Sequence, residues 1–314
     1  MRALGSARPG HGRRRTGASL IELLVALVLF GVIGAVTLRS LDRQARFHSG
    51  MLAILESRSQ HAAAHEAVAV ELRGVSPVAG DVALISDSSI VFRLPVGAGL
   101  ACDITPGTID LAPDSVAAGQ AFARFRTSPQ PGDTAWLFDE GATDSAADDG
   151  WVGLLVSAAT RAPGHCPGSP LLDPVRDAGL FSWRLSLSGS VPPPTVAPAS
   201  AVRLTRMARF ALYRGGSGEH WLGFTEAQPA TGAWITIQPV SGPYLPFNAT
   251  APSAGGIALQ GRDSSGAALV GPGIPAAISM ATRTRTTRTV RMDGVTRGRY
   301  TDSLHSLIGM RNSR

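Results

Sequence analysis

The stretch RRRTGASLIELLVALVLFGVIGAV, residues 13–36, joins three arginines to a long apolar run that contains one carboxylate, Glu22. The run extends from Ala18 to Leu38, and Glu22 is its only strongly polar member. As a helix rising about 1.5 Å per residue it would span roughly 30 Å, the hydrocarbon thickness of a bilayer. The sequence therefore predicts one membrane-spanning helix, and the arginines before it place the N-terminus in the cytoplasm.

Glu22 has two interpretations. An ionised carboxylate inside a membrane span costs at least a few kcal/mol and usually faces a partner, but an acid near the start of the span can also remain wetted at the headgroup level. If the chain is cut after Gly17, the new α-amino group of Ala18 lies in the same shallow layer. The amine of a neighbouring copy could then neutralise Glu22, so that cleavage creates the partner.

The arginines, the glycine at 17, the glutamate at 22 and the apolar run together resemble the class III signal of type IV pilins and type II secretion pseudopilins. The resemblance implies that Gly17 is recognised by the prepilin peptidase/N-methyltransferase, that Ala18 becomes the methylated mature terminus, and that Glu22 is the assembly carboxylate. Ala18 departs from the family, which most often has phenylalanine there. Small residues are tolerated at this position among minor members.

The resemblance further implies a minor subunit of the W-like or J-type kind that packs against other pilins or pseudopilins through its N-terminal helix. Such a subunit is a single-pass protein of the inner (cytoplasmic) membrane before assembly. It is then part of a periplasmic pseudopilus or a surface pilus, near the tip. The choice between a type IV pilus and type II secretion stays open.

The organisation expected from the sequence is a basic leader over 1–17, a membrane helix over 18–38, an amphipathic continuation over 39–75 and a β-rich head over 76–314. Gly50 permits a bend in the helix, and Gly74 supplies a stop signal. Apolar residues at steps of three, four or seven predict the stripe that packs on the head. This predicted stripe consists of Leu41, Ala45, Leu52, Leu55, Ala62, Ala69 and Leu72.

Three histidines, His48, His61 and His65, lie on the amphipathic continuation. His61 and His65 have the i, i+4 spacing of two metal ligands on one helix face. No further ligand type follows nearby, so we expect solvated histidines on a polar face and no metal or other cofactor.

The head reads as short β-rich runs separated by Gly, Pro, Asp and Ser, so the expected fold class is α+β with a mostly antiparallel sheet. The segment 188–200 is rich in proline and is expected to be a surface loop between strands of one head, although it could divide two lobes. The glycine-rich segment 251–274 is also expected to be a loop. The expected strands are 81–86, 89–96, 121–126, 135–138, 151–157, 180–187, 201–214, 220–226 and 233–238.

Two cysteines, Cys102 and Cys166, follow the apolar run. In an exported domain an even pair is most simply a disulfide. His165 beside Cys166 would instead suit an activated thiolate, but it sits in a Gly/Pro-rich loop and Cys102 is available as a partner.

The chain contains no lysine, which excludes P-loop and Schiff-base chemistry, and it has no usable hydrolase or dinucleotide motif. We therefore expect a protein that is not an enzyme; a membrane-anchored exported enzyme is the competing class.

Two charged segments remain. The acidic loop 138–150 offers oxygen ligands for calcium but lacks the EF-hand spacing, so we expect it to be solvated. The segment 282–300 alternates threonine and arginine, which predicts a strand with Arg283 and Arg285 on one face, at a charged sheet edge. DNA binding, as in DNA-uptake pilins, is the alternative, but aromatic residues for base stacking are missing apart from Tyr300, so we do not expect nucleic acid as a partner.

Overall fold

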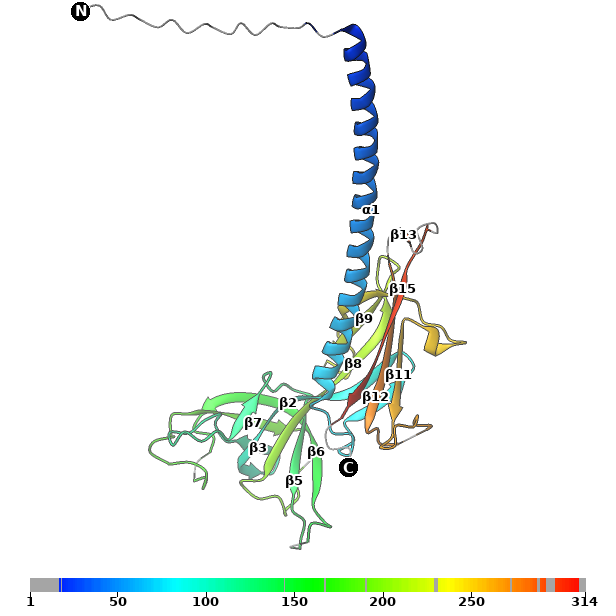
Figure 1. Ribbon diagram of the computed structural model, residues 1–314. Coiled ribbons are helices and arrows are strands. Elements are labelled where there is room, and N and C mark those ends of the chain that lie inside the picture. The colour runs from blue at the N-terminus through cyan, green and yellow to red at the C-terminus, as the bar shows by residue number, and fades with distance from the viewer. Residues whose placement is uncertain are drawn as a thin grey trace, which may run out of the picture.

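A computed structural model describes residues 17, 19–143, 145–166, 168–189, 191–228, 231–271, 273–286, 289–291 and 297–310. One long helix, α1, carries a β head at its C-terminal end (Figure 1). The head has two lobes with separate apolar cores. The predicted α+β fold, with a long N-terminal helix and an antiparallel head, is confirmed.

Helix α1 extends from Leu20 to Leu72 without interruption. Ser19 precedes it in an extended conformation, as an N-cap residue does. The run contains no proline and is rich in leucine and alanine, which favour helix. The helix continues through Gly50, the position at which the sequence permits a bend, without a break.

The first lobe, here called the barrel lobe, is a closed circuit of six antiparallel strands. Each strand is hydrogen-bonded to two neighbours, in the order β2, β3, β7, β6, β5, β8 and back to β2. Closure gives every strand two neighbours, although β6 pairs with β5 only over 150–155 and with β7 only over 156–163. The inward side chains, such as Ile109, Leu137 and Leu204, are fully buried. The strands are β2 (Ser89–Thr105), β3 (Thr108–Leu111), β5 (Thr134–Asp139), β6 (Gly150–Pro163), β7 (Phe181–Leu187) and β8 (Ala201–Arg214).

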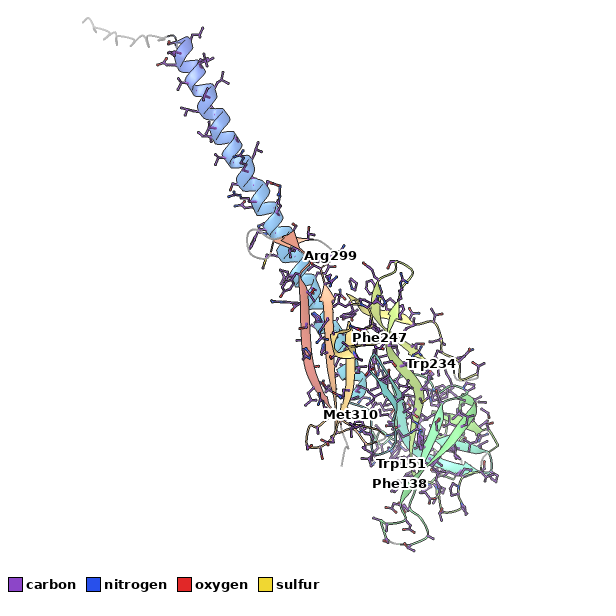
Figure 2. All side chains as sticks on the ribbon, turned by 90° about the vertical axis from the view of Figure 1, so that its right-hand side faces the viewer. Phe138, Trp151, Trp234, Phe247, Arg299 and Met310 are labelled. Atoms are coloured by element: carbon purple, nitrogen blue, oxygen red, sulfur yellow. A yellow bond between two sulfur atoms is a disulfide. The ribbon has the colours of Figure 1, made fainter. Side chains whose placement is uncertain are left out.

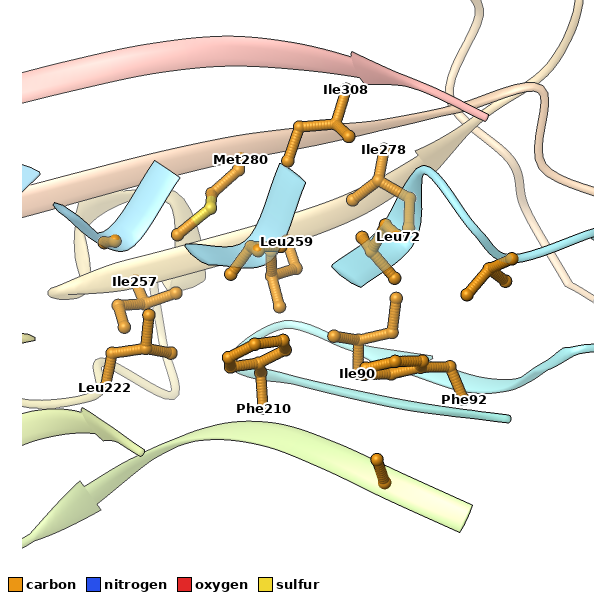
Figure 3. Close-up of a cluster of buried hydrophobic side chains, with 14 of the residues drawn as sticks. Leu72, Ile90, Phe92, Phe210, Leu222, Ile257, Leu259, Ile278, Met280 and Ile308 are labelled. Atoms are coloured by element: carbon orange, nitrogen blue, oxygen red, sulfur yellow. The ribbon is translucent and has the colours of Figure 1, made fainter. Parts of the chain in front are cut away.

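The second lobe, the helix lobe, wraps a sheet around the last turns of α1. Its core joins Leu72 of α1 to Phe92, Phe210 and Ile278 of three strands, all almost completely buried (Figure 3). Burial of each such side chain contributes about 1.5–3 kcal/mol, so this core fixes the helix to the head. The additional strands are β1 (Val82–Ser86), β9 (His220–Glu226), β10 (Gln238–Tyr244), β11 (Ile257–Arg262), β12 (Ala277–Arg285) and β15 (Thr301–Gly309).

The strands β2 and β8 belong to both lobes. They pair from Ser89↔Ala211 in the helix lobe to Leu100↔Ala201 in the barrel lobe. The register shifts once, between Pro95 and Gly97. Because proline lacks a backbone N–H, a bulge is a position in a ladder that tolerates it. Small elements complete the head: β4 (Ala123–Phe125) beside β2, the pair β13 (Val290–Arg291) and β14 (Arg297–Gly298), and the short helix Pro252–Ala254.

One strand assignment and one loop assignment from the sequence were wrong. The segment 233–238 is no strand: Trp234 makes one isolated bridge to Ala227, and Thr225 Oγ1 donates a hydrogen bond to the carbonyl of Ile235 at 2.7 Å. The segment therefore folds back on the end of β9, and β10 begins only at Gln238. The glycine-rich segment 251–274 is not loop throughout, since it contains β11. The proline-rich segment 188–200 connects β7 to β8 inside the barrel lobe and does not divide the lobes.

The disulfide between Cys102 and Cys166 is confirmed, with the two Cα atoms 5.5 Å apart. It joins β2 to the loop that follows β6 and packs with Ala112, beside Phe122 and Leu171. Because Cys166 is bonded to Cys102, the thiolate interpretation of Cys166 does not apply. His165 lines a cavity of about 420 Å³ next to this bond.

Candidate functional site

The N-terminal part of α1 stands clear of the head. No residue of α1 before Ser57 is buried, and the apolar side chains of Leu20, Phe30 and Leu38 are 79%, 74% and 69% exposed. The most apolar window of the helix has a mean hydropathy of 2.6 and none of it is buried. By length and composition, α1 is the one helix among the described residues that could cross a membrane. So much exposed apolar surface requires lipid or neighbouring helices to cover it.

The predicted stripe of α1 was only partly right. Leu41, Leu52 and Leu55 are more than half exposed. The head reaches as far along the helix as Gly50, beside Val290, but Leu52 and Leu55 lie on a face that it does not cover. The residues that do face the head begin one turn later and are displaced around the helix. They are Ser57, His61, Ala64, His65, Val68 and Leu72.

Gly17 lies immediately before this helix. It is exposed, and a Cβ added there would meet no heavy atom within 4 Å. Nothing within the described chain therefore requires glycine at this position, and a requirement would have to come from a protein that binds this segment. Ala18, the expected mature terminus, lies outside the described residues.

Glu22 is exposed in the first turn of α1. Its Oε2 accepts a hydrogen bond at 3.0 Å from the backbone N–H of Ser19, the residue before the helix. This contact is the acidic half of a capping box, in which a glutamate satisfies a backbone donor at the N-cap. From Leu23 to Leu38 the chain has no ionisable residue, so Glu22 is the only charge at this level of the helix.

Comparison with known families agrees with this local picture. Residues 12–38 match the family model described as the prokaryotic N-terminal methylation motif. No curated protein and no solved structure matches the chain at a significant level. The chain therefore carries a type IV pilin-like prepilin signal, followed by a membrane-type helix. The β head lies outside the matched region.

The contact between α1 and the head has a polar centre that the sequence did not predict. His61 and His65 are 2% and 8% exposed, so the expectation of solvated histidines was wrong. Thr282 Oγ1 lies 2.7 Å from His61 Nδ1 and 2.9 Å from His65 Nε2. Thr284 lies 3.2 Å from His61 Nε2, and Ser306 contacts His65 Nδ1. The hydroxyl groups of β12 and β15 thus hold both imidazole rings.

This environment disfavours protonation of the two histidines. Burial lowers the pKa of His61, although the charge of Asp302 opposes the shift. Burial, together with the neighbouring His61 and His305, lowers the pKa of His65 to about 4. Both rings are therefore neutral at neutral pH, where each can donate one hydrogen bond and accept another.

The predicted strand with alternating threonine and arginine is present as part of β12, but the prediction that it lies at a sheet edge was wrong. Thr282 and Thr284 are buried against α1, whereas Arg285 is exposed. However, β12 is no sheet edge, because β11 and β15 pair with it on opposite sides. The hydroxyl groups of these threonines form hydrogen bonds with the histidines of α1, which lie more than 200 residues earlier in the chain.

The acidic loop connects β5 to β6 at a protruding hairpin. Figure 2 places Phe138 and Trp151 at its base, far from the N-terminal end of α1. Asp148 accepts hydrogen bonds from the backbone N–H groups of Ala142 and Thr143, and the Thr143 hydroxyl chiefly lowers its pKa. Among the described residues, no three His, Cys, Asp or Glu side chains are grouped closely enough to hold a metal ion. Asp144 lies outside the described residues.

Proposed function

We propose that this protein is a minor pilin or minor pseudopilin, of the W-like or J-type kind, that acts as a structural subunit and not as an enzyme. The observation that carries the proposal is the prepilin signal joined to a helix whose apolar half the head leaves uncovered. A subunit of this design stores its helix in the inner membrane and later buries it among the helices of other subunits.

The staged mechanism follows from the chain's own residues. The leader arginines hold the N-terminus in the cytoplasm. The prepilin peptidase cuts between Gly17 and Ala18, which removes the leader and creates an α-amino group. On extraction into a pilus or pseudopilus, Glu22 compensates the terminal amine of a neighbouring subunit, because two opposite charges desolvated together cost less than either alone.

The head supports a role as a subunit present in few copies near the filament tip. It has two lobes, and each of the six described strands of its barrel lobe already pairs with two neighbours. Such a head suits a terminal position better than a repeating one.

The mature N-terminus tests the proposal directly. Intact-mass and N-terminal peptide analysis of the protein from its native host should find a chain that begins at Ala18 and carries one added methyl group. A matched host that lacks the peptidase should yield the full chain from Met1. A mature chain that retains the leader in the presence of the peptidase would rule the proposal out.

A further inference from the structure

The strand β15 forms one margin of the helix lobe. It pairs with β12 over its whole length, from Ala277↔Gly309 to Arg285↔Thr301, without a register shift. Its other side pairs with no described strand. In Figure 2, β15 is the red strand at the margin of the sheet, with Met310 just beyond its end.

The hydrogen bonds at the two ends of this ladder show which backbone groups of β15 point away from β12. Thr286 N–H donates to the carbonyl of Tyr300, and Met310 N–H donates to the carbonyl of Ala276. In an antiparallel pair, residues alternate between those that bond the neighbour and those that point away. The backbone groups that point away from β12 therefore belong to Thr301, Ser303, His305, Leu307 and Gly309, and of these the N–H of Ser303 is bonded to the Asp302 carboxylate.

This edge lacks the usual protection against strand pairing. Natural edges are short, bulged, covered, or marked by proline or charge. The edge of β15 has no proline and no bulge, and its one carboxylate, Asp302, lies 3.4 Å from Arg58 and also accepts the N–H of Ser303. By contrast, the margin strand β1 is short and has a bulge between Val82 and Leu84.

A groove accompanies the edge. It has a volume of about 200 Å³ and lies between His65, Ala69 and Arg73 of α1 and the end of β15. This size suits one apolar side chain. Arg73 is exposed and has no carboxylate partner in the part of the chain that the structure describes, so the groove also favours an acidic group.

We propose that the outer edge of β15 receives an extended strand from a different subunit, which adds to the sheet and places an apolar side chain in this groove. Backbone pairing supplies affinity in strand addition, and pockets for alternate side chains supply specificity. The proposal rests on the proposed function, since the neighbour is a subunit of the same assembly.

A second copy of the chain does not fit this edge equally well. In an antiparallel pair of two β15 strands, the two copies of the protein would have opposite orientations along the strand axis. Because β15 runs alongside α1, the two helices would then point in opposite directions (Figure 1). Both could not enter one membrane from the same side, which argues against antiparallel pairing of two β15 edges and favours a different chain as the partner.

The test uses the full chain in its native host, with a photo-cross-linking amino acid in place of His305 or Leu307. Val270, which is 96% exposed and distant from β15 in sequence, is the control position. The expected result is one protein adduct from both edge positions, with the two attachment sites two residues apart in one extended segment of the partner. Val270 should not give this adduct.

A proline substitution tests the backbone directly. His305→Pro removes an outward N–H but no bond to β12, so the adduct from Leu307 should fall at least about tenfold. His305→Ala keeps the N–H and should change the adduct by less than about twofold. Protease resistance of the head would report whether the proline variant remains folded.

The outcomes separate this inference from the proposed function. The inference is overturned by attachment sites without the two-residue spacing, by adducts with a second copy, or by the absence of adducts from edge positions. If those results come with a processed chain in filaments, the proposed function stands alone. If the chain is unprocessed but the spaced adduct forms in membranes, the strand-addition inference stands and the proposed function fails.

Discussion

The backbone N–H of Ser19 donates a hydrogen bond to Glu22 Oε2 at 3.0 Å, so the only ionisable group at this level of α1 already has a partner within its own chain. A capping contact of this kind needs an oxygen acceptor, whereas neutralisation of an amine needs a negative charge. The two roles of Glu22 can therefore be separated by substitution.

Glu22→Gln keeps an oxygen for Ser19 but removes the charge, and Glu22→Val removes both. If charge compensation drives assembly, both variants should be processed normally, and both should reduce incorporation into sheared filaments about tenfold or more, since ~1.4 kcal/mol corresponds to a factor of ten. Asp42→Asn is the control, because Asp42 pairs on the exposed helix surface with Arg46. Normal incorporation of the glutamine variant would assign Glu22 to helix capping instead.

Gly17→Ala should leave the folded chain unchanged but block leader removal, because an added Cβ meets nothing within the protein. The measurement is the gel mobility of the chain with and without co-expressed peptidase. Gly31→Ala is the matched control, since a Cβ there is equally unobstructed and the position lies beyond the cut. Cleavage of the Gly17→Ala chain at the wild-type rate would remove Gly17 from the recognised segment.

The docking of α1 on the head should weaken in acid. The pKa of His65 is about 4 in the folded protein, below its ordinary value of 6.5, so the unfolded chain binds the proton more readily. The contribution of neutral His65 to the free energy of unfolding is fully present above pH 6.5 and decreases as the pH drops towards 4. At pH 5 the loss is about 2 kcal/mol. Urea unfolding of the full chain in detergent at pH 7.5 and pH 5 measures the difference.

The direction of this pH effect follows chiefly from the burial of His65, and the neighbouring His61 on the same helix and His305 on β15 lower its pKa in the same direction. His65→Gln keeps a hydrogen-bonding side chain but cannot titrate, so it should flatten the pH dependence. His48→Gln is the control, because His48 is exposed. Equal pH dependence of the wild type and the His65→Gln variant would contradict the assignment.

The ion pair of Arg206 and Asp133 should be the most sensitive charge contact in the head. Arg206 is 7% exposed, Asp133 is completely buried, and their paired atoms are 2.7 and 3.0 Å apart. Arg206→Met leaves the carboxylate buried without its cation and should cost about 3–5 kcal/mol. Arg161→Met breaks an ion pair with Asp114 that is about half exposed and should cost less than about 1 kcal/mol. Similar unfolding midpoints for the two variants would refute this ranking.

Removal of the disulfide should lower the stability of the head, and we expect no loss of enzymatic activity because the proposed role is structural. The bond closes a loop with a sequence separation of 64 residues, for which the chain-entropy model gives about 4 kcal/mol. Urea unfolding of the wild type, with and without reductant, and of the Cys102→Ala/Cys166→Ala double variant measures this loss of stability. A hydrolase activity of the wild-type head that disappears with Cys166→Ser would instead support the enzyme alternative.

The sequence was sufficient where the structure depends on neighbours in the chain. The membrane-type helix, the signal around Gly17, strands β8 and β9 and the disulfide all follow from local patterns or from a single pair. It was insufficient where one side chain depends on a distant one. His61 and His65 were assigned to solvent because their partners Thr282 and Ser306 lie on strands more than 200 residues away.

The same limit explains the displaced stripe of α1. Leu52 and Leu55 have the spacing of a buried face, but burial depends on which face of the helix the head covers, and the periodicity of one helix does not contain that information. The sequence alternation correctly separated the threonines of β12 from the arginines, but it did not indicate that the threonine face is buried. Their strand was placed at an edge because β15, which covers that side, is separated from β12 by the 286–300 segment.

The two strands shared by the lobes also have a mechanical consequence. The ladder between β2 and β8 continues from one lobe into the other, and α1 is anchored beside its helix-lobe end. A pull between a membrane-held helix and a load on the barrel lobe would act along these strands and strain many hydrogen bonds in parallel. The head would then resist traction as one stiff body, with no linker between its lobes to extend first.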